Sequence, residues 1–191
     1  MTETDVGERA ADAELAARLR AEPELFTAVH HRYFRDIYRY AAGRLDAQTA
    51  EDIAADTFLT AFDQRDRFDP ERGALRPWLY GIATNLIARH RRKEARHYAA
   101  LSRVAPEPDA EGPENRVVTS VAAQRMQPHL VKAMAALTPG ERDVVLLVAL
   151  GQLSYEEVAE ALGISPGTVG SRLSRARAKL HDVIDQEALH G

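Results

Sequence analysis

The sequence contains no cysteine, so the chain can form neither a disulfide bond nor a thiolate metal site. It also lacks a long apolar run, because its longest aliphatic stretch, VVLLVAL at residues 144–150, is far shorter than the roughly 20 residues that cross a bilayer. The first residues, MTETDVGERAADAE, are polar and acidic and lack the basic start and apolar stretch of a signal peptide. We therefore expect a protein of a reducing compartment, the cytoplasm, without membrane insertion.

A surplus of positive charge is also missing. The 191 residues include 25 Lys and Arg against 29 Asp and Glu, which gives a net charge of −4. Overall charge therefore gives no affinity for nucleic acid, and any such affinity must come from a local concentration of basic residues. The length allows one ordinary domain or two small ones.

No run of alternating apolar and polar residues is long enough to predict a β-strand, so the sequence predicts an all-α fold. Apolar residues recur at helical spacing from Leu25 to Leu45, from about Thr49 to Phe62, and from about Pro77 onward. The loop before the third of these helices, RFDPERGALRP, carries two prolines and a glycine. The residues of the second helix that are expected to point inward are Ile53, Ala54, Phe58, Ala61 and Phe62.

The composition changes at VAPEPDAEGPEN, residues 104–115, which has three prolines, four acids and almost nothing to bury. This change predicts a flexible linker between two small helical domains. We expect a disordered or weakly ordered tail at 1–20, a first domain at 21–102, a linker at 103–127 and a second domain at 128–186. A weak helix is expected within the linker, near 116–126.

The second domain carries start signals for three helices. TPGE at 138–141 and SYEE at 154–157 each place a Thr or Ser three residues before a glutamate, which is a capping box. Ser165 followed by Pro166 opens the third helix.

Three positions around these helices have the residue types of a helix-turn-helix. Ala159 is small where two helices cross, Gly163 suits a tight turn, and Val169 is β-branched where the second helix rests on the first. The last helix has four basic residues and no acid between Pro166 and Leu180, so we expect its N-terminal turn to enter the major groove of DNA. The alternative is a charged amphipathic helix on a bundle surface, which these combined signals disfavour. The residues expected to contact DNA are Thr168, Ser171, Arg172, Arg175 and Arg177.

Charge is segregated in the first domain. Residues 45–64 contain five acids and no Lys or Arg, whereas residues 89–96 contain five basic residues and one acid. Asp52, Asp56 and Asp63 share one face of the acidic helix. An acidic helix next to a basic one predicts two different partners, a basic protein surface and nucleic acid, although ordinary solvation is the alternative for the acidic face.

Three segments, in this order, resemble a bacterial RNA polymerase sigma factor of the extracytoplasmic-function class: AEDIAADTFLTAF, RPWLYGIATNLIARHRRKEA and LTPGERDVVLLVALGQLSYEEVAEALGISPGTVGSRLSRARAKL. The resemblance covers about 24–102 and 128–184. It implies a transcription initiation factor that binds the polymerase core, through its β′ and β subunits, and directs it to promoter DNA. The first domain would be sigma region 2, which binds the core and the minus-ten element, and the second region 4, which binds the minus-thirty-five element. Family members are often held by an anti-sigma factor, which adds a third expected partner.

The resemblance also assigns roles to single residues. The EDIAADTF helix matches the one that docks on the β′ coiled coil, so Asp52 and Asp56 are the expected core-binding residues. Asn85 matches the family residue near the pocket for an unstacked promoter base, and Phe68 is expected to line that pocket. For Trp78, core packing is favoured over contact with the base. The residues expected to hold minus-ten phosphates are Arg89, Arg92, Lys93 and Arg96.

The sequence departs from the family pattern at three positions. Ala55 stands where the family usually has Gln, and Phe62 where it often has Trp. Gly170 replaces a basic residue of the recognition helix, and glycine weakens a helix by about 1 kcal/mol relative to alanine.

A plain helix-turn-helix regulator, which binds DNA without joining polymerase, is the alternative function, but it needs neither the acidic helix nor the aromatic WLY segment. An enzyme is not expected, because no nucleophile–base pairing is evident and GISPGTVG lacks both the spacing and the lysine of a phosphate loop. No cofactor or metal is expected either. His30 and His31 are adjacent and point to different faces, and His90 and His97 lie in a basic run that would repel a cation.

Overall fold

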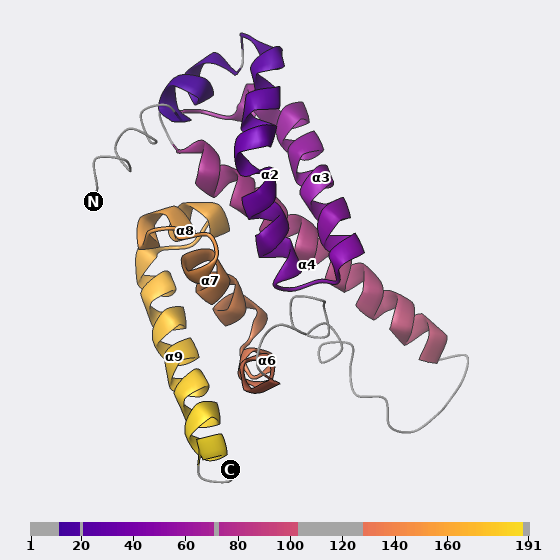
Figure 1. The fold of residues 1–191 in the computed structure, drawn as a ribbon, viewed down its shortest axis with the longest axis vertical. Helices are drawn as coiled ribbons and strands as arrows, with labels where there is room; N and C mark the ends of the chain where they lie inside the picture. Colours follow the sequence, from indigo (N-terminus) through magenta and orange to yellow (C-terminus); the bar gives the residue numbers. More distant parts are fainter. Residues whose placement is uncertain (1–11, 20, 71–72, 103–127, 189–191) are drawn as a thin grey trace.

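The structure, a computed structural model, describes residues 12–19, 21–70, 73–102 and 128–188. Every regular element in these ranges is a helix, which confirms the all-α prediction. The labelled elements in Figure 1 and the short 3-10 helices are η1 (Pro23–Leu25), α2 (Phe26–Ala42), α3 (Ala47–Gln64), η2 (Arg65–Arg67), α4 (Leu75–Ser102), α6 (Pro128–Ala135), α7 (Pro139–Ala149), α8 (Tyr155–Leu162) and α9 (Pro166–Ala188). None of the helices in the described ranges is both long and apolar enough to span a bilayer. The predicted linker and its weak helix lie outside the described residues.

Helices α2, α3 and α4 form the first unit, and their apolar faces meet in one core. α2 buries Val29, Ile37 and Tyr40 at helical spacing, as its sequence pattern predicted. The side chain of Asp46 caps α3 by accepting a hydrogen bond of 3.0 Å from the backbone N–H of Thr49.

The third predicted helix, α4, begins two residues earlier than expected. It starts at Leu75, so Pro77 lies in its first turn, where the missing N–H of proline removes no hydrogen bond within the helix. α4 then runs without a break to Ser102, and it therefore carries both the buried WLYGIAT segment and the basic segment after it.

Part of the predicted N-terminal tail is helical. The sequence predicted a tail over 1–20, but residues 12–18 form a helix and both Ala16 and Leu19 are buried. Asp12 also forms an ion pair of 3.0 Å with Arg32 of α2. The described part of the tail therefore differs from the prediction, because a small and an apolar side chain three residues apart give even a short helix a face to bury.

Helices α6 to α9 form the second unit, and both predicted capping boxes are present at the starts of α7 and α8. Ser165 caps α9 by accepting a hydrogen bond of 3.1 Å from the backbone N–H of Thr168. Gly163 ends α8 in the left-handed conformation with φ 62°, where a side chain would be strained. Ala159 and Val169 are buried as predicted, so the helix-turn-helix geometry is confirmed.

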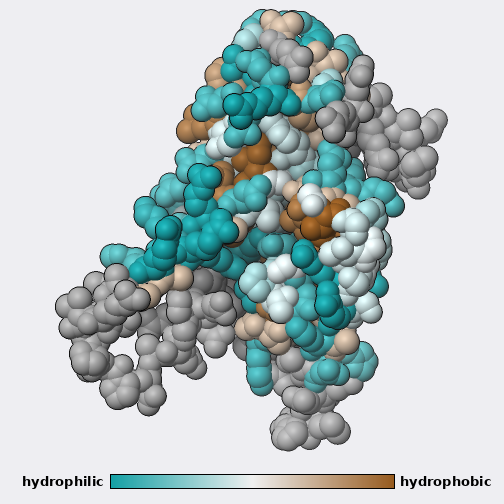
Figure 2. Space-filling model, turned by 180° about the vertical axis from the view of Figure 1, so that it is seen from behind, coloured by the Kyte–Doolittle hydropathy of each residue, from teal (hydrophilic) through white to brown (hydrophobic). Residues whose placement is uncertain are grey.

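The two units lie against each other. α8 packs along α4 (Figure 1), and one cluster of buried apolar residues runs through both units. Seen from the opposite side, the surface is largely hydrophilic, with separate hydrophobic patches (Figure 2). The outward faces of α3, α4 and α9 remain accessible to partners.

Candidate protein-binding and nucleic-acid surfaces

The outward face of α3 is acidic and carries one large apolar side chain. Asp52, Asp56 and Asp63 are all exposed, and their intervals of four and seven residues place them in one stripe along the helix. Leu59 lies in the same stripe and is 64% exposed. A leucine this exposed among carboxylates favours contact with another protein.

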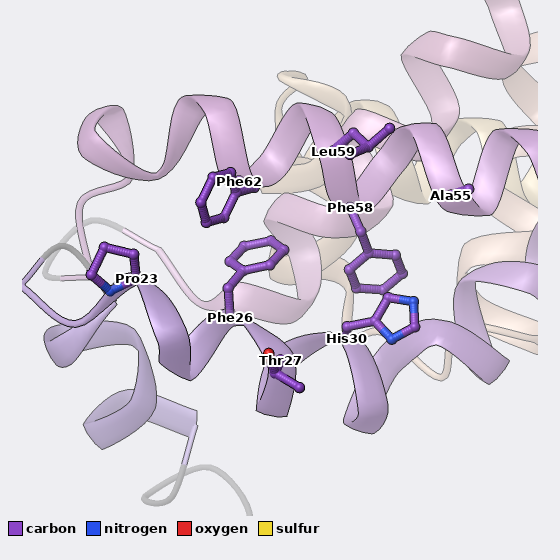
Figure 3. Close-up of a pocket in the computed structure, with 8 residues that line it drawn as sticks. All are labelled: Pro23, Phe26, Thr27, His30, Ala55, Phe58, Leu59 and Phe62. Carbon is purple, nitrogen blue, oxygen red and sulfur yellow. The ribbon is translucent and has the colours of Figure 1, made fainter.

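A hollow of about 520 Å³ adjoins this stripe, between α2 and α3 (Figure 3). Half of the residues that line it carry aromatic rings. The ring centroids of Phe26 and Phe62 lie 5.4 Å apart and those of His30 and Phe58 lie 4.9 Å apart, both in edge-to-face geometry. The other residues that line the hollow are Pro23, Thr27, Ala55 and Leu59. We call this hollow and the acidic stripe together the α3 surface.

The sequence analysis missed the apolar half of the α3 surface. It placed Phe62 inward, whereas Phe62 is 37% exposed and its ring covers one side of the hollow. The overlooked signal is Leu59, which comes three residues after Asp56 and four before Asp63, on the face that the acids mark as exposed.

The outward face of α4 is basic. The predicted minus-ten residues Asn85, Arg89, Arg92, Lys93 and Arg96 are all exposed on it. Intervals of four, three and four residues place Asn85, Arg89, Arg92 and Arg96 in one line, with Lys93 beside it. An amide followed by a line of guanidinium groups is suited to contact one base and the phosphates that follow it along a strand.

Phe68 does not stand open at the end of this line. It is 7% exposed. The centroid of its ring lies 4.7 Å from that of the Trp78 ring, and the planes of the two rings are inclined at 33°. The loop after α3 folds back over the first turn of α4, where the two rings cover each other. A base would reach Phe68 only if this ring pair separated, whereas Trp78 packs on the core as favoured from the sequence.

The apolar stripe of α9 is buried at Val169, Leu173 and Ala176, so it fixes which side of the helix faces outward. Ser171 and Arg175 lie on the outward side and are exposed. Contact with DNA would require this exposure, and the contact itself stays a prediction.

The other predicted minus-thirty-five residues do not lie on the outward side of α9 in the same way. The hydroxyl of Thr168 is 2.9 Å from that of Ser165, within the helix cap. Arg172 is half-buried and leans on the start of α7, and Arg177 is exposed on the opposite flank of the stripe. Ser174, which the sequence analysis did not single out, is exposed on the outward side.

Glu141 ties the recognition helix to α7. Its carboxylate is almost fully buried and accepts hydrogen bonds from Lys179 Nζ at 2.7 Å and from the backbone N–H of Thr138 at 2.9 Å. Arg175 Nε lies 3.9 Å from the same carboxylate. The bond from Lys179, and then that from Thr138, lower the pKa of Glu141 to about 2. The Glu141–Lys179 pair holds α9 against α7 and so helps to fix which side chains of α9 face outward.

This arrangement predicts a pH-dependent stability. Because the pKa of Glu141 is lower in the folded than in the unfolded chain, its contribution is complete above pH 4.5 and is lost as the pH falls towards about 2. Glu141→Gln should therefore lower the free energy of unfolding by about 2 kcal/mol at pH 7, since hydrogen bonds to charged groups contribute about that much. In urea unfolding, the difference in the free energy of unfolding between this variant and the wild type should become smaller as the pH falls from 5 to 2.

Glu157→Gln is the matched control, because Glu157 occupies the same place in the capping box of α8. Its carboxylate accepts a hydrogen bond of 2.7 Å from the backbone N–H of Ser154, and among the described residues no ion pair joins it to α9. Equal losses in the two variants at neutral pH would show that the bridge to Lys179 adds nothing.

In the described part of the chain, no three His, Asp or Glu side chains gather as a metal ion would require. His30 instead packs its ring on Phe34 and Phe58.

Two family models match the chain. Sigma-70 region 2 matches residues 29–97 and sigma-70 region 4 matches residues 129–180. Among curated proteins, the chain is 32% identical over 154 residues to the ECF RNA polymerase sigma factor SigE of Mycolicibacterium smegmatis, with 80% of this chain and 57% of that protein covered. It is 33% identical over 147 residues to the RNA polymerase sigma factor CnrH of Cupriavidus metallidurans, with 72% and 74% covered.

Solved structures give the same picture. CnrH in complex with the cytosolic domain of CnrY matches with a TM-score of 0.69 and 26% identity, over 92% of this chain and 98% of that one. The sigma factor RpoE in complex with the anti-sigma factor NepR from Bartonella quintana matches with a TM-score of 0.64 and 26% identity, over 84% and 96%.

Proposed function

Because the chain belongs to the extracytoplasmic-function class of bacterial RNA polymerase sigma factors, we propose that its two units bind different parts of a promoter while the first also holds the polymerase core. The chain is a transcription initiation factor that directs RNA polymerase to promoters, and polymerase core and promoter DNA are its partners. In this proposal residues 21–102 act as region 2, residues 103–127 link the units, and residues 128–186 act as region 4.

The observation that carries the proposal is the separation of charge onto different faces. α3 presents carboxylates and an apolar hollow, whereas α4 and α9 present exposed basic residues. A plain helix-turn-helix regulator would use α9 alone and would leave the α3 surface without a role.

The α3 surface is proposed to bind the coiled coil of the β′ subunit. Asp52 and Asp56 would pair with basic side chains there, and Leu59 would pack on an apolar one. Charged residues at the rim with an apolar residue at the centre are the usual anatomy of a protein interface. An anti-sigma factor with basic and apolar side chains would fit the same surface and would compete with the core for it.

The line along α4 is proposed to bind the minus-ten element. Asn85 would hydrogen-bond an unstacked base, and Arg89, Arg92, Lys93 and Arg96 would follow the phosphates. The outward side of α9 is proposed to read the minus-thirty-five element in the major groove. Sigma factors are in general not enzymes, and we propose that this chain supplies no catalytic group and works in the cytoplasm beside the polymerase.

Run-off transcription tests the function as a whole. Core polymerase alone, core with this chain, and core with a chain lacking residues 128–188 would be compared on promoters selected from genomic DNA. Specific transcripts should appear only with the full chain. Promoter-specific run-off from core alone, or none with the full chain, would contradict the proposal.

The isolated protein should bind promoter DNA poorly, whereas the holoenzyme should bind it well. The chain is net acidic, and each unit offers only a few contacts to phosphates. Linking the two units raises their joint affinity for DNA only when the distance between the units is fixed to match the promoter. Gel-shift assays at physiological salt, with and without core, measure the difference. Tight and sequence-specific binding by the protein alone would favour the plain regulator.

A further inference from the structure

The junction between the two units holds a buried arginine. α8 lies on α4, where a Cβ on Gly81 would come within 2.7 Å of the Ala161 carbonyl oxygen. Arg44, in the turn after α2, forms a 2.7 Å ion pair with Asp143 of α7, and its side chain is 1% exposed. Its guanidinium group also lies over the ring of Tyr40, 4.3 Å from the centroid. The ion pair and the ring together hold the Arg44 side chain in one orientation.

One edge of the Arg44 guanidinium group is buried without a partner. Asp143 pairs with Nη1, and among the described residues neither Nε nor Nη2 has a hydrogen-bond partner. These two nitrogens form the forked edge that matches a pair of oxygens on a carboxylate or a phosphate group. Leaving a buried donor unpaired is costly, and here two donors of one cation share the same edge. The edge is therefore prepared for an anion with at least two oxygens.

Two further arginines lie at the same junction. Arg91 of α4 donates a hydrogen bond of 3.3 Å from Nη2 to the backbone carbonyl of Arg44, and its buried Nε has no partner within the described ranges. Burial, and then the guanidinium groups of Arg44 and Arg142, lower the pKa of Arg91 to about 10. The carboxylates of Asp143 and Glu94 act in the opposite direction and offset this only in part. The three guanidinium groups are therefore close enough to repel one another.

A phosphate group fits these donors better than a carboxylate does. In the described part of the chain, three buried N–H donors of the junction lack a partner, two on Arg44 and one on Arg91. A phosphate monoester offers three strong acceptor oxygens and carries about two negative charges at neutral pH. A carboxylate offers only two oxygens and a single charge. An anion at the junction would face three guanidinium groups and the carboxylate of Asp143.

The charged cluster reaches the surface. The side chain of Asp143 is 24% exposed and Arg91 is half-buried, so a small anion need not cross the apolar core to reach it. Arg91 lies off the line of exposed basic residues on α4, because it comes one residue before Arg92 and two after Arg89. An anion held here would therefore leave the surface proposed for the minus-ten element uncovered.

We propose that the junction between the two units is a binding site for a phosphate group, held by the unpaired edge of Arg44 and by Arg91. The ligand is inorganic phosphate or a small phosphate monoester. The site is separate from the surfaces proposed for polymerase and DNA, and its existence does not depend on that function. The free full-length chain, without polymerase or promoter, is therefore the right sample for the test.

Isothermal titration calorimetry with sodium phosphate at about pH 7 and constant ionic strength should show saturable binding at one site per chain. Arg91→Gln should raise the Kd about tenfold or more, because a hydrogen bond to a charged group is lost. Arg35→Gln is the matched control, since Arg35 is exposed on α2 and its loss removes the same charge elsewhere. Its Kd should equal that of the wild type.

Asp143→Asn should bind phosphate about fivefold more tightly, because the carboxylate that repels the anion is removed. Arginines that served only to hold the fold would give no such gain. Circular dichroism checks that each variant keeps its helices, and if Asp143→Asn loses them, the comparison of Arg91→Gln with Arg35→Gln decides alone.

Two esters identify the source of the phosphate group. Binding of inorganic phosphate alone would assign the site to the free ion, and binding of phenyl phosphate as well would assign it to a monoester; both support the proposal. Dimethyl phosphate, a diester with one charge like the DNA backbone, should bind at least about tenfold more weakly. The proposal would be overturned by the absence of saturable binding, by an unchanged Kd in Arg91→Gln, by weaker binding in a folded Asp143→Asn, or by equal binding of dimethyl phosphate.

Discussion

Reversing two charges on α3, Asp52→Arg with Asp56→Arg, is expected to abolish co-elution of the protein with polymerase core in gel filtration. Both side chains are exposed, so the fold should remain intact and the change acts at the contact. A basic partner surface would then face two like charges, and like charges that face each other across an interface cost several kcal/mol. Circular dichroism and the elution of the free variant check that its fold is unchanged.

Glu51→Arg is the control on the same helix, because Glu51 is exposed but lies off the stripe. It should leave co-elution close to that of the wild type, whereas Asp56→Arg alone should already weaken it. Normal co-elution of the double variant with core would show that the α3 surface is not part of the core interface. An equal loss of co-elution in Glu51→Arg would show that only the net charge of the helix matters and not the position of the charges.

The sequence was most informative where structure is determined locally. A capping box needs only residues within one turn, so the starts of α7 and α8 followed from Thr138 and Ser154 with their glutamates. Gly163 followed in the same way, because the left-handed end of α8 and the spacing to Val169 belong to one short motif. Such signals do not depend on what packs against the helix from elsewhere.

The sequence was least informative where two distant segments meet. Phe62 fits an apolar helical face, and only its position opposite Phe26 of α2 shows that its ring walls an open hollow. Phe68 was expected to line a pocket for a promoter base, but its contact with the ring of Trp78 buries it. Periodicity gives the side of a helix and leaves open which element covers it.

The contact between the units had no sequence signal of the same kind. Gly81 lies within the WLYGIATN segment, whose likeness to the family drew attention to Asn85 instead. Arg44 lies in the turn after α2 and Asp143 lies in α7, 99 residues further along the chain, and neither residue stands out in its local sequence pattern. Long-range pairs of this type become visible only when the helices are placed in space.

On the recognition helix, the largest effect is expected from Arg175→Ala. Arg175 lies on the outward side of α9 and its side chain is 63% exposed, whereas Arg172 leans on α7. If Arg175 reaches a base edge, its loss should cost about 1–3 kcal/mol on the preferred site and relax preference at one position. Run-off transcription on a set of minus-thirty-five variants, with saturating core, measures both effects.

Arg172→Ala is the comparison that separates base reading from phosphate contact. Arg172 is expected to contact a phosphate and not a base. Its loss should therefore weaken binding to all promoter variants to a similar degree and lower the salt dependence of binding by about one phosphate contact. Because Arg175 also lies 3.9 Å from Glu141, a change in the rotation of α9 must be distinguished from a lost contact. The Lys179–Glu141 bond of 2.7 Å remains in Arg175→Ala and should hold the helix in place, so the stability of the variant at pH 7 should match that of the wild type. An unchanged ranking of promoter variants would then remove Arg175 from base reading, and unchanged activity would remove it from the DNA interface.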